Sequence, residues 1–192
     1  MGTGAPKEEK DDAVWILRED QLRCLASATR MDIVDHLAGR GPMSIKQLAQ
    51  AIGRQPSALY HHLDKLLAVD LVREAGRRVA NRKQELLYAT PSRRMRLRRA
   101  LEGGEHGEVM REIVGSLCRQ AERDFARGQG KRSASAEGSA RNLGFFRLVA
   151  RPGPARLARI NALLEEVGEL LWQEEDGDGE VVLLTWVMAP GD

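Results

Sequence analysis

The chain has 192 residues, enough for one domain of ordinary size and a smaller second one. Its two cysteines, Cys24 and Cys118, lie far apart with no Cys/His cluster nearby, which argues against a disulfide framework or a structural zinc site. No run approaches the ~18 apolar residues that a membrane-spanning helix needs. Residues 1–12 contain no apolar signal core. We therefore expect a cytoplasmic protein with no membrane segment and a disordered tail at residues 1–12.

The net charge of +2 conceals an uneven distribution of charge along the chain. Residues 73–99 carry ten basic side chains against Glu74 and Glu85, whereas residues 165–180 carry eight acidic side chains and no basic one. A concentrated basic stretch is typical of nucleic-acid binding, because it neutralises phosphates. This asymmetry predicts different roles for the two regions.

The first predicted elements are helical. We expect an apolar turn at residues 13–17, followed by a helix at 21–28 and another at 30–38. In the second helix Met31, Val34 and Leu37 recur at helical spacing. Gly39, Gly41 and Pro42 then end it.

Two short helices joined by a tight turn are predicted for residues 44–66. Ser44 and Gln47 have the spacing of a capping box, and Gly53 is suited to end the first helix. Pro56 suits the first position of the second helix, whose inward face is formed by apolar residues, Leu59, Leu63 and Leu66. This is the spacing of a helix-turn-helix, whose second helix enters the major groove of DNA. An ordinary helical hairpin with a polar outer face has the same pattern.

The outward residues of the second helix suit DNA recognition. Small side chains allow close approach, and polar ones reach base edges or phosphates. The candidate DNA-binding residues of this segment are Gln55, Ser57, Ala58, Tyr60, His61 and Lys65.

A strand beginning at Leu71 and Val72 and a return strand at 85–89 predict a hairpin after this helix. Its tip carries four basic residues, Arg77, Arg78, Arg82 and Lys83. A basic hairpin after a recognition helix is typical of a wing that binds the DNA backbone or minor groove. A solvated basic loop is the alternative. Residues 91–101 form either a linker helix or an extension that contacts phosphates.

Residues 20–90 resemble the winged helix-turn-helix of ArsR-type bacterial transcription regulators. The resemblance depends on an opening motif, Leu25, Thr29, Arg30, Ile33 and Leu37, and on a recognition motif, Pro56, Ser57, Leu59, His61, His62, Leu63 and Leu66. It implies a homodimer that reads a roughly palindromic operator, usually as a repressor released by an effector. Metal-sensing members carry a Cys-x-Cys before the turn, which this chain lacks, so the resemblance does not carry a metal site with it.

The remaining chain predicts a helix and a small module. An apolar stripe at 108–127 indicates a dimerisation or connecting helix over residues 102–128, although the same stripe suits internal core. Residues 129–142 are small, polar and glycine-rich and predict a flexible linker. Residues 143–192 predict a β-α-β module with strands at 145–150 and 181–188 around a helix at 155–173.

These elements predict an α+β fold with a winged helix-turn-helix domain at residues 13–101, followed by a helix and a C-terminal module. The module is expected to serve dimerisation, contact with a partner protein, or binding of an unknown effector. We expect a sequence-specific regulator with its recognition helix at 56–68 and its wing at 73–89. The alternative is a protein-interaction module or a non-specific nucleic-acid binder. No catalytic motif, metal-ligand set or cofactor motif is recognisable, so we expect no enzyme activity and no cofactor.

Overall fold

The computed structural model describes residues 13–16, 18–80, 82–97, 100, 104–172 and 179–191. The chain divides into two compact units, residues 1–110 and 111–192, each of which is described by itself. The predicted tail at 1–12 and residues 173–178 lie outside the described residues.

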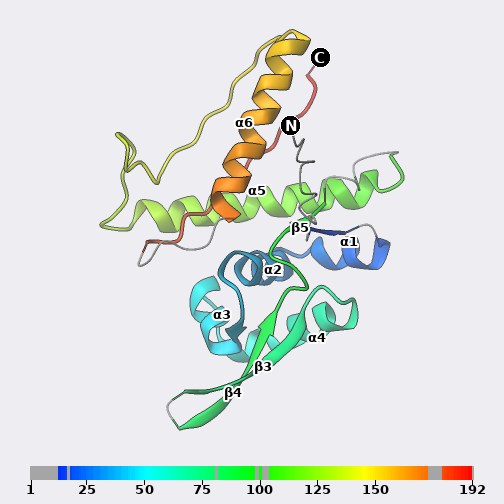
Figure 1. Cartoon of the computed structure of the whole chain (residues 1–192), viewed down its shortest axis with the longest axis vertical. Helices are drawn as coiled ribbons and strands as arrows, with labels where there is room; N and C mark the ends of the chain where they lie inside the picture. The colour runs from blue at the N-terminus through cyan, green and yellow to red at the C-terminus, as the bar shows by residue number, and fades with distance from the viewer. Residues whose placement is uncertain are drawn as a thin grey trace, which may run out of the picture. The chain divides into compact units, whose positions relative to one another are not determined.

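The first unit contains the predicted pair of short helices. Helix α1 spans Glu19–Leu25, α2 spans Ala28–Arg40, α3 spans Ile45–Ile52 and α4 spans Tyr60–Ala68 (Figure 1). The capping box is confirmed, because Ser44 Oγ accepts from the Gln47 amide at 3.4 Å and the Ser44 amide donates to Gln47 Oε1 at 2.9 Å. Gly53 ends α3 at φ +73°, in the left-handed conformation that glycine adopts without steric cost.

Helix α4 has a tighter entry than an ordinary α-helix. Pro56–Ala58 form one turn of 3₁₀ helix, η1, before α4 begins at Tyr60. The predicted inward face is confirmed, since Leu59, Leu63 and Leu66 are fully buried. Helix α4 packs against α2, which also contacts α1 and α3. The core of this unit therefore holds the recognition helix by its apolar side and leaves its polar side outward.

The wing is a hairpin of two long strands. Strand β3 spans Arg73–Ala80 and β4 spans Lys83–Ala89, and β4 also pairs with the short β2, Met43–Ser44, in an antiparallel sheet of order β2-β4-β3. The hairpin begins at Arg73 and not at Leu71 as expected. Leu71 and Val72 are buried, and the Leu71 amide donates to the Leu66 carbonyl at 3.0 Å. These two residues therefore close the end of α4 against the core.

Residues 13–17 were expected to form an apolar turn leading into the first helix, and the structure differs from this prediction at Val14 and Trp15. Val14–Trp15 form strand β1, which pairs in parallel with β5, Met95–Arg96. The Val14 amide donates to Arg94 O and the Ile16 amide to Arg96 O, both at 2.9 Å, and Ile16 is buried. Pairing with a segment ~80 residues away overrides the local preference. Of residues 91–101, Met95–Arg96 form this strand and 98, 99 and 101 lie outside the described residues.

The second unit contains most of one long helix and all of another. Helix α5 spans Gly107–Gln129 and α6 spans Pro154–Trp172, close to their predicted ranges. The predicted strands at 145–150 and 181–188 are not formed, and neither has a strand partner among the described residues. Phe145, Phe146 and Val149 are more than 80% exposed. An apolar run indicates that a segment tends to be buried but does not supply the neighbouring strand that β pairing requires.

Within the second unit, Asn142 stabilises the segment that follows α5. Its side chain accepts from the Ser135 amide at 2.8 Å and donates to the Ser133 carbonyl at 3.0 Å. The edge of the Phe145 ring contacts Phe125 of α5 at 5.6 Å between ring centroids. The predicted linker therefore contains a closed turn held by one amide side chain.

We expect replacement of Ser44 by alanine to lower the free energy of unfolding by about 1 kcal/mol, because the first turn of α3 loses its capping acceptor. Chemical denaturation followed by circular dichroism measures this change. Ser57→Ala is the matched control, since Ser57 is exposed and should change stability by less than about 0.5 kcal/mol. Equal losses in both variants would contradict the assigned capping role.

Candidate nucleic-acid interface

The outward face of the recognition segment contains all of its predicted DNA-binding residues. Gln55, Ser57 and Ala58 are exposed at η1, and Tyr60, His61 and Lys65 are exposed on α4. Buried Leu59 and Leu63 are four residues apart and therefore share one face of the helical segment. The exposed candidate residues lie on the opposite face. The result is a continuous exposed surface with hydroxyl, amide, phenol and imidazole groups.

One edge of α4 faces the base of the wing. The pKa of the Tyr88 phenol on β4 is raised, first by burial and then by the negative charge of Glu74, with smaller effects from Tyr60 and Asp64. Tyr60 and Asp64 therefore lie near the root of the hairpin. This part of α4 therefore lies within electrostatic range of Tyr88 on strand β4.

On the other side of α4, basic side chains lie around His62. His62 is half-buried, its Nδ1 has no hydrogen-bond partner, and burial is the main cause that lowers its pKa. Its charged neighbours, which lower the pKa further, are all basic: Arg30, His61, Arg54 and Lys65. Arg30 is held in place by donating to the Cys24 carbonyl. Sequence reasoning did not select Arg30 or Arg54, although both adjoin the helix-turn-helix motif.

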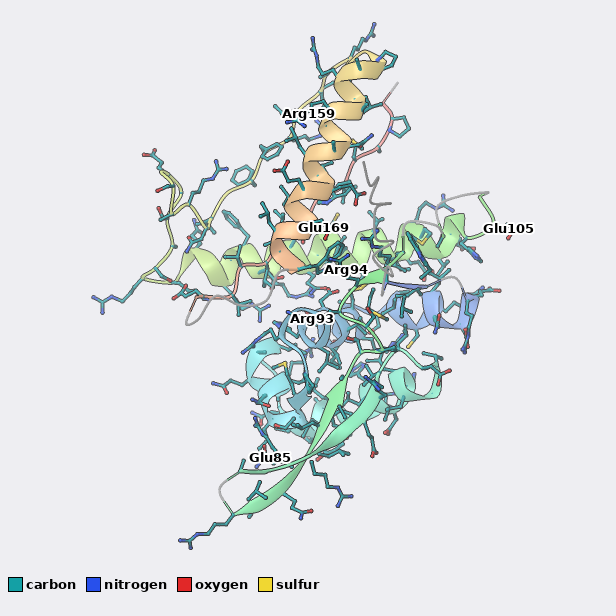
Figure 2. The ribbon with its side chains drawn as sticks, in the orientation of Figure 1. Glu85, Arg93, Arg94, Glu105, Arg159 and Glu169 are labelled. Atoms are coloured by element: carbon teal, nitrogen blue, oxygen red, sulfur yellow. The ribbon has the colours of Figure 1, made fainter. Side chains whose placement is uncertain are left out.

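The wing arginines have two different environments. Arg78 donates to Glu85 at 3.2 Å, and Lys46 of α3 donates to the other oxygen of the same carboxylate at 2.9 Å. The two cations lower the pKa of Glu85, Lys46 more than Arg78. Glu85 thus ties the wing to α3 (Figure 2). Sequence reasoning missed this link because Lys46 and Glu85 are 39 residues apart.

The other predicted wing residues are exposed. Arg77 makes only a long contact of 3.5 Å to Gln84, and Arg82 lies at the tip with φ +61°. Lys83 begins β4 and is exposed. Arg77 and Arg78 point to opposite faces of the hairpin because successive strand residues alternate, and a bulge at Gly76, whose φ is +90°, sets which of the two faces Glu85. The wing therefore presents Arg77, Arg82 and Lys83 outward while Arg78 faces inward.

The far end of α4 is tied to α1. Gln21 Nε2 donates to the Val69 carbonyl at 2.9 Å, and Arg18 forms ion pairs with Asp70 at 3.1 Å and Asp20 at 2.6 Å. Asp70 lies at φ +60°, a left-handed position that aspartate tolerates. These contacts fix the direction in which the recognition helix points.

A basic residue after the wing forms a hydrogen bond within the folded unit. Arg93 Nη2 donates to the Gly39 carbonyl at the end of α2 at 3.0 Å (Figure 2). This contact gives the basic segment after β4 a structural role. Arg93 therefore has a hydrogen-bond partner within the protein and does not need a DNA phosphate to have one.

Across the described ranges, no group of three or more His, Cys, Asp or Glu side chains is placed to hold a metal ion. Both cysteines are free thiols. None of the helices in the described part of the chain is long and apolar enough to cross a membrane.

Comparison with known families agrees with this geometry. Residues 25–75 match the model of a family described as a helix-turn-helix domain. The match runs from the last residue of α1 through α2, α3, η1 and α4 into β3. A comparison with curated proteins finds no match. The chain therefore contains a helix-turn-helix domain, followed by a β-hairpin wing, and this domain supports a DNA-binding regulator.

We expect the lowered pKa of His62 to make the folded domain less stable as the pH falls. The unfolded chain takes up a proton near the ordinary pKa of 6.5, while the folded state resists protonation, so stability is present above that pH and is lost below it. His62→Gln should remove this part of the pH dependence between about pH 7 and 5, measured by denaturation at each pH.

The neighbouring histidine is the matched control for this test. His61 is exposed, so His61→Gln should keep the loss of stability at low pH. Nuclear magnetic resonance titration should show His62 protonating at a lower pH than 6.5. Protonation of His62 at or above that pH would contradict the assigned burial effect.

Proposed function

We propose that this chain is a sequence-specific DNA-binding transcriptional regulator of the ArsR type that acts as a homodimer and as a repressor. The observation that carries the proposal is the exposed polar face of η1 and α4 beside a basic hairpin. A recognition helix supplies base contacts, and a basic wing supplies phosphate contacts. The ArsR type and the repressor role depend on the resemblance of residues 20–90.

Residues 56–68 enter the major groove in this proposal. Gln55, Ser57, Tyr60 and His61 contact base edges or nearby phosphates, because amide, hydroxyl and imidazole groups match the donors and acceptors there. Ala58 allows the helix entry to approach closely, and Lys65 reaches a phosphate.

Residues 73–89 contact the DNA backbone or the minor groove. Arg77, Arg82 and Lys83 are the phosphate-binding residues because their side chains are exposed. Arg78 contributes by holding the wing against Glu85, which Lys46 fixes from α3. A homodimer would place two recognition helices about one helical turn of DNA apart, roughly 34 Å.

The proposal is tested by measuring affinity for DNA from upstream of the chain's own gene and for scrambled duplex of the same composition. We expect the upstream site to bind about a thousandfold more tightly at physiological salt. Footprinting should locate a protected, roughly palindromic site. Equal affinity for both duplexes would indicate a non-specific binder, and no salt-dependent binding would indicate a protein-interaction module.

Replacing Arg77 and Arg82 together by alanine should weaken binding to specific and scrambled duplex alike. Each lost phosphate contact removes about 0.9 from the slope of log affinity against log salt, so the slope should fall by up to about two units. Fluorescence anisotropy at several salt concentrations measures it.

Arg23→Ala is the matched control for the loss of positive charge. Arg23 lies on α1, where it is exposed and pairs with Glu19, and Figure 1 shows α1 away from the wing tip. This variant should leave the salt slope unchanged. A slope that is the same in the double variant and the wild type would remove the wing from the interface.

A further inference from the structure

The second unit exposes an unusual amount of apolar surface. Of nineteen large hydrophobic side chains that are exposed in the described chain, seventeen lie between Phe145 and Met188. A soluble monomer rarely exposes an apolar patch larger than roughly a few hundred Å². With roughly 50–100 Å² accessible on each side chain, these residues offer on the order of 1,000 Å². Six of these side chains lie on helix α6, so this helix contributes one part of that area.

Helix α6 organises part of this surface as a seam. Four apolar residues follow one another at spacings of three, four and three: Ile160, Leu163, Val167 and Leu170. Their exposed fractions are 36%, 44%, 38% and 59%. This spacing is that of the core positions of a two-helix coiled coil, and Leu157, Leu164 and Leu171 widen one edge of the seam.

The other edge of the seam carries opposite charges at its two ends. Arg159 and Glu166 occupy equivalent positions one heptad apart beside the seam. The N-terminal end of α6 is basic and the C-terminal end is acidic, and Figure 2 shows Arg159 and Glu169 toward opposite ends of the helix. When two identical helices pair in antiparallel fashion, the same edge of each helix meets, so that Arg159 of one copy lies opposite Glu166 of the other, twice.

We propose that α6 is the dimer interface, pairing antiparallel with α6 of a second copy about a two-fold axis near Leu163. This inference deepens the homodimer of the proposed function and depends on that dimer. A second copy fits because the charges beside the seam are complementary to themselves about this axis. Parallel pairing would place these charges opposite the leucine edge and would leave them without a partner.

The apolar stripe of α5 is a poorer candidate for the interface. Val109 and Ile113 on that helix are already buried within the single chain, with 7% and 3% of their surface exposed, and Leu117, Ala121 and Phe125 are half-buried. The seam of α6 remains accessible along its whole length. The interface is therefore assigned to α6 and not to α5.

The test is a charge exchange, with the mass of the full-length protein measured without DNA by analytical ultracentrifugation over a range of concentrations. We expect the wild type to be a dimer. R159E and E166R should each raise the dimer dissociation constant about tenfold, because each places two like-charged pairs across the axis. The double variant R159E/E166R should restore the constant to within about threefold of the wild type, which a simple folding defect would not do.

Two further variants locate the interface. Leu163→Glu puts charges at the two-fold axis and should give a monomer with unchanged helix content by circular dichroism. Arg119→Glu reverses an exposed charge on α5 and should leave the dimer intact. A monomeric wild type, unchanged dimer affinity in both single variants, or no recovery in the double variant would overturn the assignment.

Failure of this inference and failure of the proposed function are distinguishable. Preference for the upstream duplex together with α6 variants that remain fully dimeric overturns only the interface. Recovery of the dimer in R159E/E166R without any preference for the upstream duplex supports the interface and contradicts the proposal that the protein is a sequence-specific regulator.

Discussion

Burial of the inner face of α4 is the constraint on which the DNA-binding unit depends. Leu59, Leu63 and Leu66 have no more than 1% of their surface exposed, and α4 packs against α2, which also contacts α1 and α3. Because the apolar side of a short helix is fixed in this way, its polar side has one outward direction. Gln21 of α1 contacts Val69 and Arg18, just before α1, contacts Asp70, so the residues that directly follow α4 are also held. The candidate recognition surface is therefore a consequence of core packing.

The wing is oriented by a different kind of interaction. A single carboxylate, Glu85, accepts from Arg78 within the hairpin and from Lys46 on α3, and its side chain is only 12% exposed. Exposed ion pairs contribute little to stability, but a largely buried carboxylate with two cations constrains geometry. One of the four basic residues predicted to bind phosphate thus has a structural role. The pairing of the strands decides which basic residue contacts Glu85, namely Arg78, and which are exposed, namely Arg77, Arg82 and Lys83.

Local signals made the helix-turn-helix predictable, whereas long-range pairing did not. The capping box at Ser44, the left-handed Gly53 and the buried leucines of α4 each follow from residues within one or two turns. The exposed recognition residues could be chosen for the same reason. The β1–β5 pair, the Lys46–Glu85 contact and the position of Arg30 near His62 join segments far apart in the sequence, so no local pattern indicates them. The prediction of strands at 145–150 and 181–188 is wrong because the hydrophobicity of a segment does not specify which neighbouring element packs against it.

The bulge at Gly76 has a consequence for how the hairpin tolerates a slip in register. If the extra residue were paired regularly, every later side chain of β3 would move to the other face, and Arg77 would replace Arg78 opposite Glu85. Since both positions are arginine, the carboxylate would keep a guanidinium partner and the outer face would keep one as well. Because residues 77 and 78 are both arginine, each face of the wing would carry the same charged group in either register of strand pairing. The positive φ of Gly76 then selects which of two nearly equivalent arginines is the anchor.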